Sequence, residues 1–157
     1  MFKKALKMIH KEFSKEKLTW AVIGSTNMKL QGINIQPNDL DIIVKLSDLK
    51  KIAVIFKKYH SENKIEKAKT KTGETIYRIN VEIAKTNIEI VGERDSGIYS
   101  RGLLSNQIIK IKLGDIEIPC FTLEAEEKAY LLRKRFNRAK IIRDFLTNKA
   151  YSYTNPA

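Results

Sequence analysis

The strongest constraint on the fold is the alternation of short apolar runs with helical patterns in the N-terminal third of the chain. Residues 18–23 form an apolar run that stops at Gly24, which predicts a buried strand leading into a turn. Residues 40–44 form a second such run, and Asp48 behind it favours the start of a helix over residues 49–59. This strand, helix, strand, helix order predicts an α/β (α+β) domain with helices packed on the sheet.

Later segments show the residue alternation typical of half-buried strands. Residues 76–83 and 88–91 are expected to form neighbouring antiparallel strands, which makes the predicted sheet a mixed one. Residues 107–113 and 116–121 are expected to form a further hairpin, in which Pro119 marks a sheet edge.

Amphipathic helices are predicted near both ends of the chain. Phe2, Leu6, Ile9 and Phe13 recur at helical spacing. Thr122 is expected to cap a C-terminal helix. The apolar side of that helix carries four residues at helical spacing: Ala125, Ala129, Leu132 and Phe136.

Length and cysteine content favour one domain. A chain of 157 residues is about one ordinary domain long, so we expect a single domain over residues 1–150 and a frayed tail over residues 151–157. Cys120 is the sole cysteine and cannot form an intrachain disulfide. Because no apolar run approaches membrane-spanning length, we expect a cytoplasmic protein that does not enter a membrane.

The chain carries a formal net charge of +12, which favours a polyanionic partner. The alternative is a merely solvating surface, because most of the excess is lysine scattered along the chain. The arginines are less evenly spread, and four lie close together near the C-terminus: Arg133, Arg135, Arg138 and Arg143. This region is the better candidate for phosphate contact.

Three acidic residues are candidates for metal ligands. Asp39 and Asp41 are two residues apart at the start of a predicted strand, so both side chains point to one face, where divalent cations would relieve their repulsion. Glu89 lies in the centre of an otherwise apolar strand, where a buried carboxylate needs a partner or a metal. The alternatives are a solvated Asp-x-Asp loop and an exposed position for Glu89.

Gly24 and Ser25, between a strand and a helix start, form a turn in which the backbone can approach a phosphate. Together with Asp39, Asp41 and Glu89 in this order, the turn resembles the nucleotidyltransferase superfamily related to DNA polymerase β, particularly its small single-domain members. The resemblance covers residues 18–143.

The resemblance implies transfer of NMP from an NTP such as ATP to an acceptor hydroxyl, with release of pyrophosphate. Mg²⁺ or Mn²⁺ would be held by Asp39, Asp41 and Glu89, with Glu89 completing the acceptor-side metal site or acting as base. Gly24 and Ser25 would hold phosphates. Lys128, in a helix that resembles the one closing the site in small members, would reach the triphosphate.

Residues 35–38 depart from the family, because many members carry a basic residue and Thr or Ser just before the first Asp. The chain is also too short for an extra acceptor-binding domain, so a partner protein or a second subunit could present the acceptor, which could be RNA, including tRNA, or protein. Two other functions fit the charge: a non-catalytic nucleotide-binding regulatory module and a basic nucleic-acid-binding domain.

Overall fold

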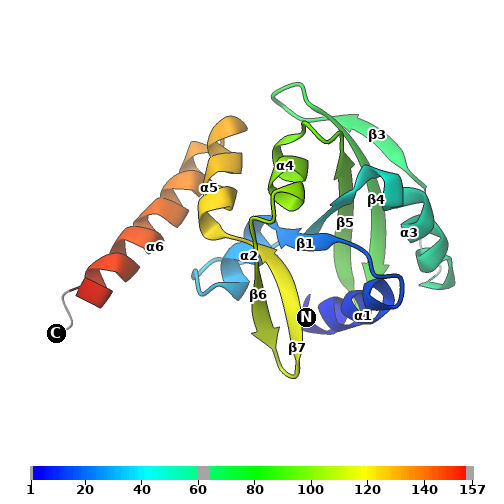
Figure 1. Cartoon of the computed structure of the whole chain (residues 1–157), viewed down its shortest axis with the longest axis horizontal. Coiled ribbons are helices and arrows are strands. Elements are labelled where there is room, and N and C mark those ends of the chain that lie inside the picture. The colour runs from blue at the N-terminus through cyan, green and yellow to red at the C-terminus, as the bar shows by residue number, and fades with distance from the viewer. Residues whose placement is uncertain (1, 60–63, 155–157) are drawn as a thin grey trace.

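The structure is a computed structural model, which describes residues 2–59 and 64–154 (Figure 1). Within these residues, seven strands form one sheet in the order β3-β4-β5-β2-β1-β7-β6. The strand bounds are β1 Trp20–Ile23, β2 Leu40–Lys45, β3 Glu66–Lys69, β4 Thr75–Ile83, β5 Thr86–Glu93, β6 Ile108–Leu113 and β7 Ile116–Phe121. The pairs β2–β5 and β1–β7 are parallel, and the other pairs are antiparallel, which confirms the predicted mixed sheet.

Helices cover both faces of the sheet. Their bounds are α1 Phe2–Lys15, α2 Gly24–Leu30, α3 Leu49–Phe56, α4 Ile98–Leu104, α5 Leu123–Leu132 and α6 Phe136–Thr154, with short 3-10 turns at η1 Leu46–Asp48 and η2 Lys57–Tyr59. α1 and α3 pack on one face in the larger apolar cluster, and α4 and α5 pack on the other face in a second cluster. α5 and α6 form a hairpin beside the sheet, and the far end of α6 extends away from it (Figure 1).

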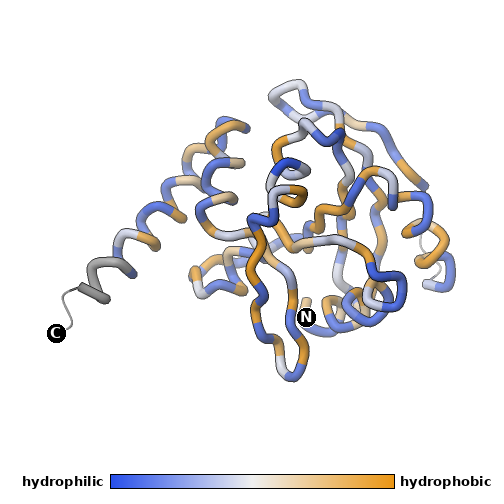
Figure 2. The backbone as a smooth tube through the Cα atoms, in the orientation of Figure 1, coloured by the Kyte–Doolittle hydropathy of each residue, from blue (hydrophilic) through white to orange (hydrophobic). Residues whose placement is uncertain are grey.

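The alternation of side chains in β2 divides its residues between these two faces. Leu40, Ile42 and Val44 are fully buried in the cluster under α1 and α3. Asp41 and Ile43 therefore point to the face that carries α4 and α5. The same alternation is visible in the β6–β7 hairpin, where hydrophobic and hydrophilic residues follow one another along the tube (Figure 2).

Several predicted details are wrong, and packing explains them. Pro119 does not lie in an edge strand, because its strand β7 lies between β1 and β6. β7 pairs with β1 only at Val22 and Cys120, so the N–H that proline lacks costs little there. Leu132 and Phe136 are 53% and 60% exposed, because α5 ends at Leu132 and the chain turns outward.

The ends of three helices also differ from prediction. Gly24 and Ser25 are the first residues of α2 and not a separate turn. Asp48 precedes α3 but makes no side-chain capping bond, because η1 leads directly into the helix. α6 continues to Thr154, into the segment expected as a tail, and residues 155–157 lie outside the described residues. No helix in the described part of the chain is long and apolar enough to cross a membrane.

Candidate active site

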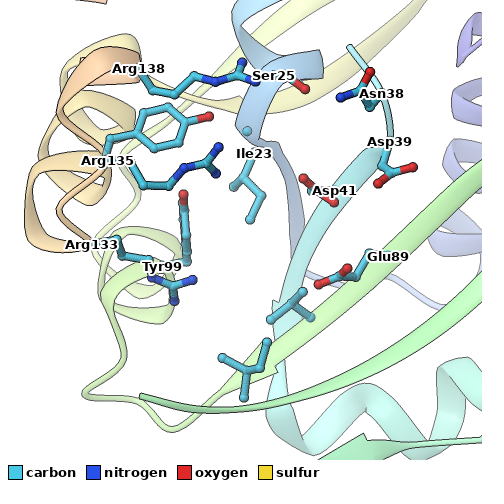
Figure 3. A pocket seen from close by; sticks show the side chains of 14 residues that line it. Ile23, Ser25, Asn38, Asp39, Asp41, Glu89, Tyr99, Arg133, Arg135 and Arg138 are labelled. Atoms are coloured by element: carbon cyan, nitrogen blue, oxygen red, sulfur yellow. The ribbon is translucent and has the colours of Figure 1, made fainter. Parts of the chain in front are cut away.

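A cavity of about 300 Å³ lies between the sheet and the α5–α6 turn. Its sheet side carries Asp39, Asp41 and Glu89, so the structure brings the three predicted acids to one place. Its helical side carries arginines from the end of α5 and the start of α6. Figure 3 shows the carboxylates and the guanidinium groups on opposite sides of the cavity, with Ile23 between them.

The acids converge because of strand register. Asp41 in β2 is paired with Glu89 in the parallel strand β5 and with Ile23 in β1. Paired positions point to the same face, so the two carboxylates are neighbours. Asp39 lies just before β2, two residues back on the same face, where its Oδ1 accepts a hydrogen bond of 3.2 Å from Asn87 Nδ2.

Burial and the close approach of the carboxylates raise the pKa of two of these acids, Asp41 and Glu89. Burial first, and then the neighbouring carboxylates, Glu89 foremost among them, together raise the pKa of Asp41 to about 7. Burial also raises the pKa of Glu89, whereas Arg78 opposes that rise. Arg78 Nη1 lies 3.9 Å from Glu89 Oε2.

The three carboxylates are ligands of the chemical type that a hard divalent cation prefers. Three carboxylates on one sheet face supply the oxygen ligands that Mg²⁺ and Mn²⁺ prefer, and the pKa of Asp41 is raised by burial first and then by the negative charge of its neighbours. In the described part of the chain, no three acidic, histidine or cysteine groups already converge on one point. Asp39 bonds Asn87 and Glu89 faces Arg78, so these two side chains would turn to bind an ion.

Gly24 supports Asp41 in a way that the sequence did not reveal. It has φ +74°, and a Cβ there would lie 2.9 Å from Asp41 Oδ2. Its N–H donates to Glu126 Oε1 at 2.6 Å, so this amide is already used. Gly24 therefore makes room for the carboxylate of Asp41, while Ser25 lines the cavity (Figure 3).

Glu126 was missed by sequence reasoning, although an acid between Ala125 and Ala129 on an apolar helix side was a usable signal. Its side chain is fully buried, and burial raises its pKa. Besides Gly24, it accepts hydrogen bonds from Asn27 Nδ2 and from Tyr99 Oη. Glu126 thereby joins α5 to α2 and α4, and it bonds Gly24 and Tyr99, which both line the cavity.

Three arginines line the helical side of the cavity. Arg133, Arg135 and Arg138 line it, and among the described residues Arg133 Nε and Arg138 Nη1 are buried donors with no hydrogen-bond partner. Arg133 is held in place by Glu93, whose Oε2 lies 3.1 Å from Arg133 Nη2, and it lies over the ring of Tyr99. The guanidinium groups that line the cavity suit an anionic ligand, because arginine donors form strong hydrogen bonds to phosphate and carboxylate oxygens.

Two predicted basic contacts are not brought to this cavity. Lys128 lines a separate cavity. Glu126 and Lys128 are two positions apart on α5 and therefore point in nearly opposite directions, and it is Glu126 that is buried. Arg143 is paired with Glu127, its Nε lying 2.7 Å from Glu127 Oε2. The arginines around the α5–α6 turn occupy the place expected for Lys128.

Gly24→Ala should lower stability and also the NTP affinity that the sequence resemblance implies, because a Cβ there is strained at positive φ and displaces Asp41. We expect a loss of roughly 2–4 kcal/mol in unfolding free energy. Gly73→Ala is the matched control, since Gly73 also has positive φ but a Cβ there meets nothing within 4 Å. Denaturant unfolding and NTP titration of both variants would test this, and equal effects would contradict it.

The fold is that of the nucleotidyltransferases, as solved structures show, in agreement with the resemblance seen in the sequence. No family model and no curated protein matches the sequence. A candidate nucleotidyltransferase of Thermotoga maritima is 23% identical, with a TM-score of 0.70 over 94% of this chain and 93% of that one.

The antibiotic-resistance factor ANT(2″)-Ia has the same fold. Its structure in complex with adenylyl-2″-tobramycin is 10% identical, with a TM-score of 0.58 over 96% of this chain and 94% of that chain. Its solution structure gives a TM-score of 0.51 at 10% identity, over 98% of this chain and 97% of that one. At these identities the likeness establishes the architecture of the chain.

Proposed function

We propose that this chain is a metal-dependent nucleotidyltransferase that moves NMP from an NTP to an acceptor hydroxyl and releases pyrophosphate. The observation that carries the proposal is the cavity with carboxylates on one side and arginine guanidinium groups on the other (Figure 3). A metal-bound triphosphate has the complementary pattern, with cations to face the acids and phosphate oxygens to face Arg133 and Arg138.

The residues divide the work according to their positions. Asp39 and Asp41, with Glu89, would hold Mg²⁺ or Mn²⁺, which when bound neutralises charge on the triphosphate and on the leaving group. Glu89 takes the proton of the acceptor hydroxyl, a role helped by the raised pKa that burial gives it.

The bond changes follow from this arrangement. The acceptor oxygen forms a new bond to the α-phosphorus, and the bond from that phosphorus to the bridging oxygen of the β-phosphate breaks. Pyrophosphate leaves with both bonding electrons, and the guanidinium groups of Arg133 and Arg138 stabilise its negative charge. Ser25, which lines the same cavity, would also contact a phosphate.

The solved structures support the reaction class. ANT(2″)-Ia has been seen with an adenylylated molecule, and the Thermotoga protein is described as a candidate for the same class. We therefore include ATP among the proposed substrates, with RNA or protein as acceptor.

Incubation with NTPs labelled at the α-phosphate, together with cell extract and Mg²⁺, tests the proposal. Label on a macromolecule or metabolite, with equal release of pyrophosphate, supports transfer. Metal-dependent NTP binding with neither label nor pyrophosphate would instead support a regulatory nucleotide-binding module.

NTP affinity should fall by at least about 100-fold when EDTA removes divalent cations, because the acids then repel the triphosphate. Calorimetry of NTP binding with Mg²⁺, with Mn²⁺ and with EDTA would measure this. Equal affinities in the three conditions would mean that the carboxylates are not a metal site.

A further inference from the structure

A second, larger cavity of about 640 Å³ adjoins the candidate active site. The two cavities share four lining residues, namely Tyr99, Tyr130, Arg133 and Arg135. The outer wall of the second cavity is the β3–β4 turn, and its inner wall is the end of α5. A molecule in this second cavity would thus border the proposed triphosphate site.

The second cavity is basic. Four cationic side chains line it: Lys71, Arg133, Lys134 and Arg135. None of its described lining residues is acidic. The nearby carboxylate of Glu74 accepts hydrogen bonds from the hydroxyls of Thr70 and Thr72, which lower its pKa. The field in the cavity therefore favours an anionic occupant.

The α5–α6 turn continues this basic surface and adds an exposed aromatic ring. Its backbone closes α5 through bonds from Lys134 N to Leu131 O and from Arg135 N to Tyr130 O, with Lys134 at φ 58°. The chain leaves this closure outward, and Phe136 is 60% exposed. A hollow of about 360 Å³ runs over residues 134–138.

We propose that the acceptor is a single strand of nucleic acid, bound over the second cavity and the α5–α6 turn. Lys71 and Lys134 contact its phosphates, and a base stacks on Phe136. Basic grooves with exposed aromatic rings are typical of single-strand binding, because every base has a π face and every linkage a charge. The inference deepens the proposed function and rests on it for the role of the strand as acceptor.

Fluorescence anisotropy with a labelled single-stranded RNA of about 12 nucleotides, without NTP or metal, tests the binding surface. Lys71→Gln with Lys134→Asn should lower the slope of log affinity against log salt by about 1.4, or ~0.7 for each lost phosphate contact. Asn is chosen at Lys134 because it tolerates positive φ. Phe136→Leu should weaken binding roughly tenfold, whereas Phe136→Tyr should restore it.

Lys4→Gln with Lys11→Gln is the charge-matched control, since both lysines are exposed on α1, across the sheet from the cavity. If this control weakens RNA binding as much as the cavity variant, or if the wild-type protein binds neither RNA nor single-stranded DNA of the same sequence, the inference is overturned. NTP affinity with Mg²⁺ should stay unchanged in the Lys71 and Lys134 variant, because neither residue lines the acidic cavity. Since RNA binding is measured without turnover, its failure is separable from a failure of the proposed transfer.

Discussion

Asp41→Asn should abolish nucleotidyl transfer and at the same time stabilise the metal-free protein. Asp41 is paired in register with Glu89, and its carboxylate occupies the position that a side chain at Gly24 would otherwise crowd. The carboxylate of Asp41 is therefore central to the acid cluster. Asparagine keeps the shape and removes the charge that would bind the metal. We expect the rate of pyrophosphate release to fall by a factor of roughly 10³ or more.

The stability gain should depend on pH. The pKa of Asp41 is raised from 3.8 to about 7, so the folded state prefers the protonated acid. Below the pKa of Asp41 in the unfolded state, the carboxyl is protonated in both states and does not lower the free energy of unfolding. The destabilisation grows as pH rises from about 4 to about 7, and it is complete above that range. Asp41→Asn should therefore add up to ~4 kcal/mol at about pH 8.5, and much less at about pH 5.

Thermal unfolding at both pH values, with and without Mg²⁺, would measure these effects. Mg²⁺ should raise the melting temperature of the wild-type protein at pH 8.5 far more than that of Asp41→Asn. Asp115→Asn, in the exposed β6–β7 turn, is the control for loss of one negative charge. A destabilised Asp41→Asn protein that retains activity would show that the carboxylate is structural.

Local sequence patterns predicted much of the fold. The apolar runs in β1 and β2 were recognisable because they are short, buried and ended by Gly24 or polar residues. The spacing of Asp39 and Asp41 predicted that they share a face, because strand periodicity is local. α4 was missed, because it is a helix of only seven residues with no side-chain cap at its N-cap residue Gly97, and its first amides bond the carboxylate of Glu93 in the preceding strand instead.

Long-range relations could not be derived from the sequence. The pairing of Asp41 with Glu89 depends on the parallel register of β2 and β5, which are separated along the chain by α3, β3 and β4. The bond from Gly24 to Glu126 joins residues 102 positions apart. That Lys128 lines a different cavity from the acids could not be derived either, since only the rotation of α5 about its axis decides which of its side chains face the acidic cavity.

Glu89→Gln should abolish transfer while leaving NTP affinity within a few-fold of the wild type. Asp39, Asp41 and the arginines hold the triphosphate in the proposed site, whereas Glu89 takes the acceptor proton. Loss of a general base lowers the rate by roughly 10² to 10⁴. Calorimetry with Mg²⁺ and an assay of pyrophosphate release would separate binding from turnover.

Glu82→Gln is the matched control, because it removes the same charge from a glutamate outside the acidic cavity. Glu82 lies in the neighbouring strand β4 on the same sheet face, two positions from the residue paired with Glu89. It is exposed and lies outside the acidic cavity, so its loss should change neither affinity nor rate. Normal turnover in Glu89→Gln, or an equal loss in Glu82→Gln, would overturn the assignment of Glu89, because position within the cavity is the difference on which that assignment rests.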